Sequence, residues 1–269
     1  MQVRHDCLIL FNRYEGFRRP EPPPRERAYS GELSDHARAR LRKAFDLFLQ
    51  LFPPRVIENK ATKRKQLFRA ALVTLTIPSS KIVSLRQGNR DLLQPFLRHL
   101  RAPGRAYIWK AEAQKRGQLH YHIVYSHFAH YDEVRVRWNR ILKRKGLLDE
   151  FARKHHHFNP PSTRVESVRN VRRMGAYFEK YLAKQEVTNL GEGKVWDCSK
   201  GLKVNRFSFD LSSSQLHMIT SAAAQAKCVL RETENAIVVA GNRKPLSLLN
   251  RFYRTRYEAW RKDTLEGLS

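Results

Sequence analysis

The sequence predicts an α+β fold built around an antiparallel sheet, and three observations support this prediction. Short strand patterns alternate with helical patterns along the chain, and no internal repeat is visible. Two consecutive strand patterns, at 105–114 and 118–126, are separated by a turn short enough for a β-hairpin. A hairpin makes its two strands antiparallel, and the helical segments between the other strands are expected to cover the sheet.

The composition indicates a polyanion as the partner. The 269 residues carry 52 Lys and Arg against 25 Asp and Glu, a net charge of +27, which favours nucleic acid or an anionic surface. Hydrophobic residues make up 41%, too many for a wholly disordered chain. No apolar run approaches the about 18 residues of a membrane span, and we expect neither membrane binding nor a signal peptide. The cysteines are few and widely spaced, which argues against a disulfide framework or a thiolate zinc site.

The first third of the chain combines a linker, a helix and a basic run. Residues 18–27 are rich in proline and charge and are expected to form a solvated linker. Ser34 is a helix cap, and apolar residues at helical spacing predict a helix over 35–51 that Pro53 and Pro54 end. Residues 59–69 are very basic, and this run is either a solvated face or a DNA contact.

The remaining elements follow the same logic of periodicity and turn signals. In order, we expect a strand at 70–77, a helix at 88–100, the two hairpin strands, a helix at 131–145, a strand at 163–168, a helix at 170–185, a strand at 203–211, a helix at 214–226, short strands near 228–240 and a final helix around 249–260.

The hairpin is the most informative segment. Because strand side chains alternate between faces, its odd and even positions lie on opposite sides of the sheet. The odd positions are apolar or aromatic: Trp109, Ala111, Ala113, Leu119, Tyr121, Ile123 and Tyr125. The even positions are polar: Lys110, Glu112, Gln114, Gln118, His120 and His122. Both histidines are therefore expected to leave the core and to share a polar face.

The turn brings a carboxylate to the two histidines. A three-residue loop of Lys115, Arg116 and Gly117 pairs Gln114 with Gln118, and hence Glu112 with His120. Directly opposed residues are about 5 Å apart, so two imidazoles and a carboxylate come within reach of one metal ion. Three protein ligands leave coordination positions open, as in catalytic sites, and the set is compatible with Mg²⁺, Mn²⁺, Zn²⁺ or Fe²⁺. Alternatively, Glu112 is a surface carboxylate that balances nearby lysines.

A second candidate site lies on the helix predicted at 170–185. Tyr177 and Tyr181 are four residues apart and share a helix face, and Lys180 and Lys184 follow each of them by three. A tyrosine oxygen can attack a phosphodiester, and nearby cations favour the phenolate and the charged transition state. In the alternative interpretation, the two tyrosines merely flank a buried apolar stripe.

Together these segments resemble the HUH endonuclease superfamily, specifically the rolling-circle replication initiators of small single-stranded DNA phages and plasmids. The resemblance covers about residues 70–200 and consists of three motifs in order. They are Leu72-Val-Thr-Leu-Thr-Ile-Pro78; Trp109-Lys-Ala-Glu112 with Gly117-Gln-Leu-His120-Tyr-His122; and Tyr177-Phe-Glu-Lys-Tyr181-Leu-Ala-Lys184.

The resemblance implies a ferredoxin-like antiparallel sheet with a divalent metal, Mg²⁺ or Mn²⁺, on one open face. It makes His120 and His122 metal ligands with Glu112 as the third, and it makes Tyr177 and Tyr181 the nucleophiles with Lys180 and Lys184 beside them. The implied division is an N-terminal linker and accessory helix (1–66), a nickase core (67–212) and a C-terminal accessory region (213–269).

The function implied by the resemblance is initiation of rolling-circle replication. The chain would nick origin DNA as a single strand, keep the 5′ end on tyrosine and transfer or religate it. No Gly-x-x-x-x-Gly-Lys-Ser/Thr occurs, so helicase and polymerase are expected from the host, in the cytoplasm of a bacterium if a phage or plasmid encodes the chain. Alternatives are a single-strand transposase of the same superfamily and a catalytically inactive DNA-binding repressor.

Overall fold

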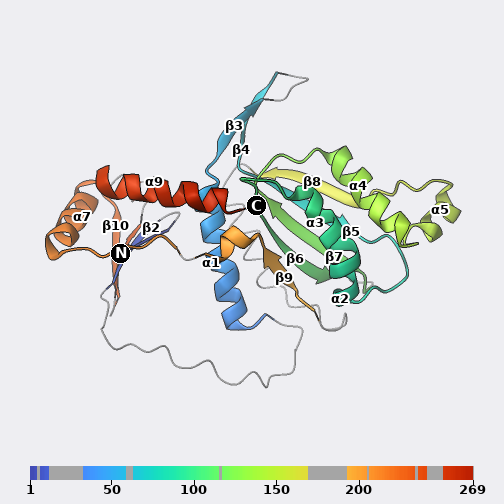
Figure 1. The fold of residues 1–269 in the computed structure, drawn as a ribbon, viewed down its shortest axis with the longest axis horizontal. Coiled ribbons are helices and arrows are strands. Elements are labelled where there is room, and N and C mark those ends of the chain that lie inside the picture. Colours follow the sequence, from blue (N-terminus) through green and yellow to red (C-terminus); the bar gives the residue numbers. More distant parts are fainter. Residues whose placement is uncertain are drawn as a thin grey trace.

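The structure of this chain is a computed structural model. It describes residues 1–4, 7–11, 33–58, 63–114, 117–168, 193–204, 206–233, 236–240 and 251–268. Figure 1 shows a large sheet with its helices on one side, a smaller unit on the other, and helix α1 (Asp35–Leu51) between them. Helices and antiparallel sheets together confirm the α+β prediction.

The larger sheet holds the predicted hairpin at its centre. Within the described residues it has five strands in the order β8-β5-β7-β6-β9, and every neighbouring pair is antiparallel. The strands are β5 (Ala70–Thr76), β6 (Tyr107–Ala113), β7 (Leu119–Tyr125), β8 (Thr163–Val168) and β9 (Trp196–Cys198). Strand β7, which contains His-Tyr-His, is flanked on both sides and cannot slip without breaking two ladders.

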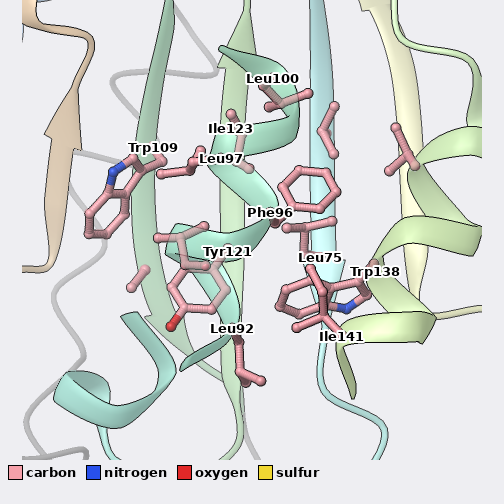
Figure 2. Close-up of a cluster of buried hydrophobic side chains, with 14 of the residues drawn as sticks. Leu75, Leu92, Phe96, Leu97, Leu100, Trp109, Tyr121, Ile123, Trp138 and Ile141 are labelled. Carbon is pink, nitrogen blue, oxygen red and sulfur yellow. The ribbon is translucent and has the colours of Figure 1, made fainter. Parts of the chain in front are cut away.

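One face of this sheet carries the main apolar core. The aromatic rings of Trp109, Tyr121, Phe96 and Trp138 meet edge to face there, with neighbouring centroids 5.9 to 6.3 Å apart (Figure 2). The covering helices are α2 (Leu85–Gly88), the π-helical turn η1 (Asn89–Leu93), α3 (Gln94–Leu100) and α4 (Tyr131–Arg144). Together α2, η1 and α3 replace the single helix expected at 88–100. Gly88 permits this close packing, because a Cβ there would lie 2.4 Å from Leu119 Cδ1.

The opposite face is apolar over only part of its length, and α1 covers that part. Apolar residues of α1, among them Phe45 and Phe48, pack against Leu72, Ile108 and Val124 of three neighbouring strands. Ser34 Oγ accepts a hydrogen bond from Ala37 N at 3.2 Å, as its predicted capping role requires.

Two arginines from elsewhere in the chain cap the carboxyl end of α1. Arg69 donates to Leu49 O at 2.9 Å, and Arg261 donates to Leu51 O at 2.7 Å. The last carbonyls of a helix lack partners within it and carry partial negative charge, so buried guanidinium groups both satisfy and neutralise them. These bonds fix α1 between the sheet and the C-terminal helix.

The smaller unit joins the two ends of the chain. Four of the described strands form its sheet, in the order β1 (Gln2–Val3), β2 (Cys7–Phe11), β11 (Ala236–Ala240) and β10 (Val229–Thr233). Helices α7 (Ser213–Gln225) and α9 (Arg251–Glu266) complete it, and Phe209 stacks on Tyr253 with centroids 4.2 Å apart. The pairing of β2 with β11 was not anticipated by the division at 66 and 212, which stays a prediction.

Strands β3 (Arg55–Glu58) and β4 (Lys65–Phe68) pair with each other into a β-ribbon. The ribbon occupies the basic run that sequence analysis treated as a solvated face or DNA contact, with no strands foreseen. The remaining described elements are a short helix α5 (Asp149–His155) and a 3₁₀ turn η2 (Lys200–Lys203).

The prediction of a strand at 203–211 was wrong. The described residues of this stretch contain the end of η2 and a single bridge between Ser208 and Gln2. The alternation arises because Phe207 and Phe209 both enter the core of the smaller unit while Ser208 stays exposed. The linker at 18–27 and the helix at 170–185 lie outside the described residues. In the part of the chain that is described, no helix is long and apolar enough to cross a membrane.

We expect Phe48→Ala to lower the free energy of unfolding by about 3 to 5 kcal/mol, because it opens a cavity between α1 and the sheet. Phe48 is fully buried, whereas Val136 on α4 is 53% exposed, so Val136→Ala is the control and is expected to change little. Urea unfolding of both variants is the measurement. Equal stability of the two would mean that α1 is not packed on the sheet.

Candidate functional site

The candidate site is the polar half of the sheet face that α1 does not cover. Cross-strand partners form rows on this face, and the row of Leu72, Val124 and Ile108 lies under α1. The next row joins Thr74, His122 and Lys110, and the one after it joins Thr76, His120 and Glu112. The face therefore changes from apolar to polar along three neighbouring strands at once.

The register of the hairpin is the predicted one. Glu112 pairs with His120 and Lys110 with His122. Gly117 has a φ of +82°, its N–H donates to Gln114 O at 2.8 Å, and Gln114 N donates to Gln118 O at 2.8 Å. A left-handed glycine thus closes the turn and sets which residues face the site.

Threonines of β5 hold the two imidazoles. Thr76 Oγ1 lies 3.2 Å from His120 Nδ1, and Thr74 Oγ1 lies 3.2 Å from His122 Nδ1. The two rings are neighbours on one strand face, with centroids 4.5 Å apart. Hydrogen bonds at Nδ1 fix the ring orientation, which is the arrangement by which metal-binding histidines are usually supported through their other nitrogen.

A carboxylate and an ammonium group complete the polar cluster. Glu112 Oε2 lies 3.3 Å from His122 Nε2, and Glu112 Oε1 lies 3.8 Å from Lys110 Nζ. All three side chains are largely buried, with exposed fractions of 10 to 13%. A carboxylate so poorly solvated needs a nearby positive charge to remain ionised, and Lys110 supplies one.

The structure brings Glu112 to His122 rather than to its cross-strand partner. His120 Nδ1 instead lies 2.9 Å from Gln114 Nε2, and Gln114 follows Glu112 on the same face of the hairpin. Side chains reach diagonal neighbours across a pleated sheet, so register alone did not decide which polar group approaches which histidine.

The donor set suits a divalent metal in its chemistry. Two atoms bonded at about 2.1 Å to one ion are about 3.0 to 3.4 Å apart, and the 3.3 Å between Glu112 Oε2 and His122 Nε2 falls in this range. Among the described residues, however, no three His, Cys, Asp or Glu side chains are close enough together to form a complete metal site. His120, His122 and Glu112 as metal ligands therefore stay a prediction.

The described tyrosines of the hairpin do not face the site. Tyr121, between the two histidines, is fully buried in the core and donates to Asn89 Oδ1 at 3.2 Å. Burial raises the pKa of Tyr121 well above its usual range, and burial also raises the pKa of Tyr125. Both stay protonated at neutral pH and are unsuited to act as nucleophiles.

The predicted nucleophiles and their companions, Tyr177, Lys180, Tyr181 and Lys184, lie outside the described residues. Within the described part, sequence analysis missed Thr74, Thr76 and Lys110 as site residues. The alternation of the strand at 70–77 signals that its threonines share a face. Their contact with the histidines depends on β5 pairing with β7, which no local pattern reveals.

A comparison with protein families identifies the segment that contains this site. Residues 70–186 match a family model of replication-associated proteins of the ORF2 type. The match supports a Rep-type replication initiator. It begins with β5, includes both histidines, Glu112 and both candidate tyrosines, and leaves out α1, the β-ribbon and the smaller unit. No curated protein and no solved structure matches the chain significantly.

We expect Gly117→Ala to destabilise this Rep-type segment by about 1 to 2 kcal/mol, because a Cβ disfavours the left-handed backbone at φ +82°. No atom lies within 4 Å of the added Cβ, so the effect is conformational and not a clash. Gly117→Asn is the matched control, because asparagine tolerates this conformation better. Urea unfolding of both variants is the measurement, and equal loss from Ala and Asn would contradict a left-handed residue here.

Proposed function

We propose that this chain is a rolling-circle replication initiator that nicks one strand of origin DNA through a tyrosine, with the help of a divalent metal. The observation that carries the proposal is the polar half-face of the sheet with His120, His122 and Glu112. It lies inside the segment matched by the replication-associated family model and precedes Tyr177 and Tyr181 in the chain. The net charge of +27 supports DNA as the substrate.

His120, His122 and Glu112 would hold the metal, with Gln114 as the alternative oxygen donor beside His120. Mixed imidazole and carboxylate ligation suits Mg²⁺ or Mn²⁺ and also admits Zn²⁺ and Fe²⁺. When bound, the ion would polarise a non-bridging oxygen of the scissile phosphate. Thr74 and Thr76 would orient the imidazoles, and Lys110 would balance the charge of Glu112 close to the DNA backbone.

The tyrosine performs the covalent step. Its phenolic oxygen forms a bond to phosphorus, the bond from phosphorus to the 3′ oxygen breaks, and the 3′ oxygen leaves and takes up a proton as a hydroxyl. The phenolic proton passes to solvent or to a base, and Lys180 and Lys184 would favour the phenolate. The product is a 5′-phosphotyrosine, which keeps a reactive ester for a later strand transfer.

The 3′ hydroxyl would prime a polymerase, and we propose that helicase and polymerase come from the host. A bacterial cytoplasm would supply both. A single-strand transposase of the same superfamily would share the chemistry and differ in its DNA target. A catalytically inactive repressor would share only the binding surface. Cleavage assays separate the repressor from the other two.

We expect His120→Ala and His122→Ala each to reduce cleavage by on the order of 100-fold or more while DNA binding is largely retained, because phosphate contacts come from dispersed Lys and Arg. Single-stranded oligonucleotides that tile the DNA around its own gene, with Mn²⁺, are the substrates. Glu112→Ala is expected to raise the Mn²⁺ concentration needed for cleavage, with Gln114→Ala as the matched control. Full cleavage in EDTA would contradict a metal-dependent mechanism.

We expect Tyr177→Phe to eliminate the first covalent adduct and Tyr181→Phe to spare nicking but impair strand transfer. On a helical wheel Tyr177 lies farther from the apolar stripe and nearer Lys184, so its hydroxyl reaches the phosphate at lower cost. Mass spectrometry of the trapped peptide–oligonucleotide adduct is the measurement. Loss of nicking in Tyr181→Phe alone would reverse this order, and binding without any adduct would favour the repressor.

A further inference from the structure

The β-ribbon of β3 and β4 is a feature that the proposed chemistry does not use. It projects from the body of the molecule, at the top of Figure 1, between α1 and the large sheet. It also lies outside residues 70–186, the segment matched by the family model. A projecting ribbon contributes little to the core, so its residues are available for an interaction.

The base of the ribbon is fixed to the sheet. Phe68, the last residue of β4, is fully buried in the main core, and the Arg55 guanidinium lies 5.1 Å above its ring. Arg55 also donates to Ser126 O at 3.1 Å, just beyond the end of β7. The ribbon therefore leaves the sheet in a defined direction.

One face of the ribbon is exposed along its whole described length. Because side chains alternate, Val56, Glu58, Lys65 and Leu67 share a face, and all four are exposed, whereas Phe68 and its neighbours on the other face are buried or half-buried. Val56 and Leu67 are direct cross-strand partners with exposed fractions of 64% and 45%. The fold itself makes no use of this aliphatic pair.

The end of the ribbon away from the sheet is strongly basic. Lys63, Arg64 and Lys65 are consecutive and exposed, and the acidic residue of the exposed face is Glu58, whose Oε1 lies 3.8 Å from Lys63 Nζ. Three cations against one carboxylate leave a positive surface next to the aliphatic pair. This combination complements the phosphate backbone and the apolar groove edges of nucleic acid.

We propose that the β-ribbon binds double-stranded DNA next to the nick site, with its exposed face in the major groove. The major groove is about 12 Å wide and admits a two-stranded ribbon, whose strands are about 5 Å apart before side chains are added. Lys63, Arg64 and Lys65 contact phosphates, and Val56 and Leu67 contact sugars or thymine methyl groups.

The character of the exposed face favours a duplex over a single strand. Single-stranded binding surfaces combine positive charge with aromatic side chains on which bases stack. The described residues of the exposed face offer aliphatic and charged side chains, and none of them is aromatic. A ribbon that is rigid at its base suits a groove of fixed width better than a flexible strand.

The ribbon and the histidines stand at opposite ends of strand β5. The ribbon enters β5 at Ala70, whereas His120 pairs with Thr76 at the other end. Six residues of strand span about 20 Å, the length of about six base pairs. The ribbon therefore contacts a flanking duplex while the cleaved strand lies at the histidines. This inference assumes that DNA is the substrate but does not depend on cleavage chemistry.

The test uses the full-length protein in EDTA, so that binding is measured without cleavage. The variant K63A/R64A/K65A is compared with R140A/R144A/R153A, which removes the same charge from exposed positions on α4 and α5. Fluorescence anisotropy follows binding to a labelled duplex and to a labelled single strand, each about 20 nucleotides long, between about 50 and 200 mM salt.

We expect the ribbon variant to bind duplex at least about tenfold more weakly and to lower the slope of log K against log salt by about 2 to 3, with single-strand affinity much less affected. V56T/L67T keeps the charge and the strand propensity, and it is expected to weaken duplex binding with an unchanged salt slope. Equal losses on duplex and single strand, or equal losses in the ribbon and control variants, would overturn the proposal.

Cleavage of an unstructured single strand separates this proposal from the proposed function. If the ribbon variant nicks such a strand as the wild type does but binds duplex weakly, both proposals stand. If no protein cleaves under any divalent metal while the ribbon variant still loses duplex affinity, only the proposed function fails. Unchanged duplex affinity in a normally folded ribbon variant, checked by thermal unfolding, overturns the ribbon proposal alone.

Discussion

The pairing register of β6 with β7 is the constraint on which the rest of the molecule depends. One strand supplies both the centre of the core, through Tyr121, and the polar cluster, through His120 and His122. Because side chains alternate, a slip of one residue would bury both imidazoles and expose the phenol. The left-handed Gly117 and the ladders on both sides of β7 hold this register. Folding and site assembly are thus the same event, and the core pays no separate cost for the site.

A single helix divides the other sheet face into a structural and a functional half. Helix α1 covers the rows that contain Leu72, Ile108 and Val124 and leaves the next two rows uncovered by its apolar residues. The arginines that cap α1 come from the strand entry at Arg69 and from the C-terminal helix at Arg261. The position of α1, and with it the border of the polar half, therefore depends on segments far apart in the sequence.

Local sequence patterns predicted what depends on one strand or one helix and failed where a partner decides. Alternation and turn chemistry were sufficient for the Glu112–His120 register and for the faces of the hairpin. They did not reveal that Thr74 and Thr76 meet the imidazoles, because strand order is a property of the whole sheet. The ribbon escaped notice because each of its strands is only four residues long and interrupted by charge. Phe207 and Phe209 imitate a strand because both enter one core from an irregular segment.

The pairing of β2 with β11 has a consequence for the order of assembly during synthesis. Cys7 pairs with Ala240, so this ladder closes a loop that includes almost the entire chain. Closing so long a loop early is entropically costly, whereas the β6–β7 hairpin needs only local contacts. On the ribosome the hairpin and its helices emerge and pack first, and the first strands wait for the last. The amino-terminal strands are therefore the last part of the described fold to find their place.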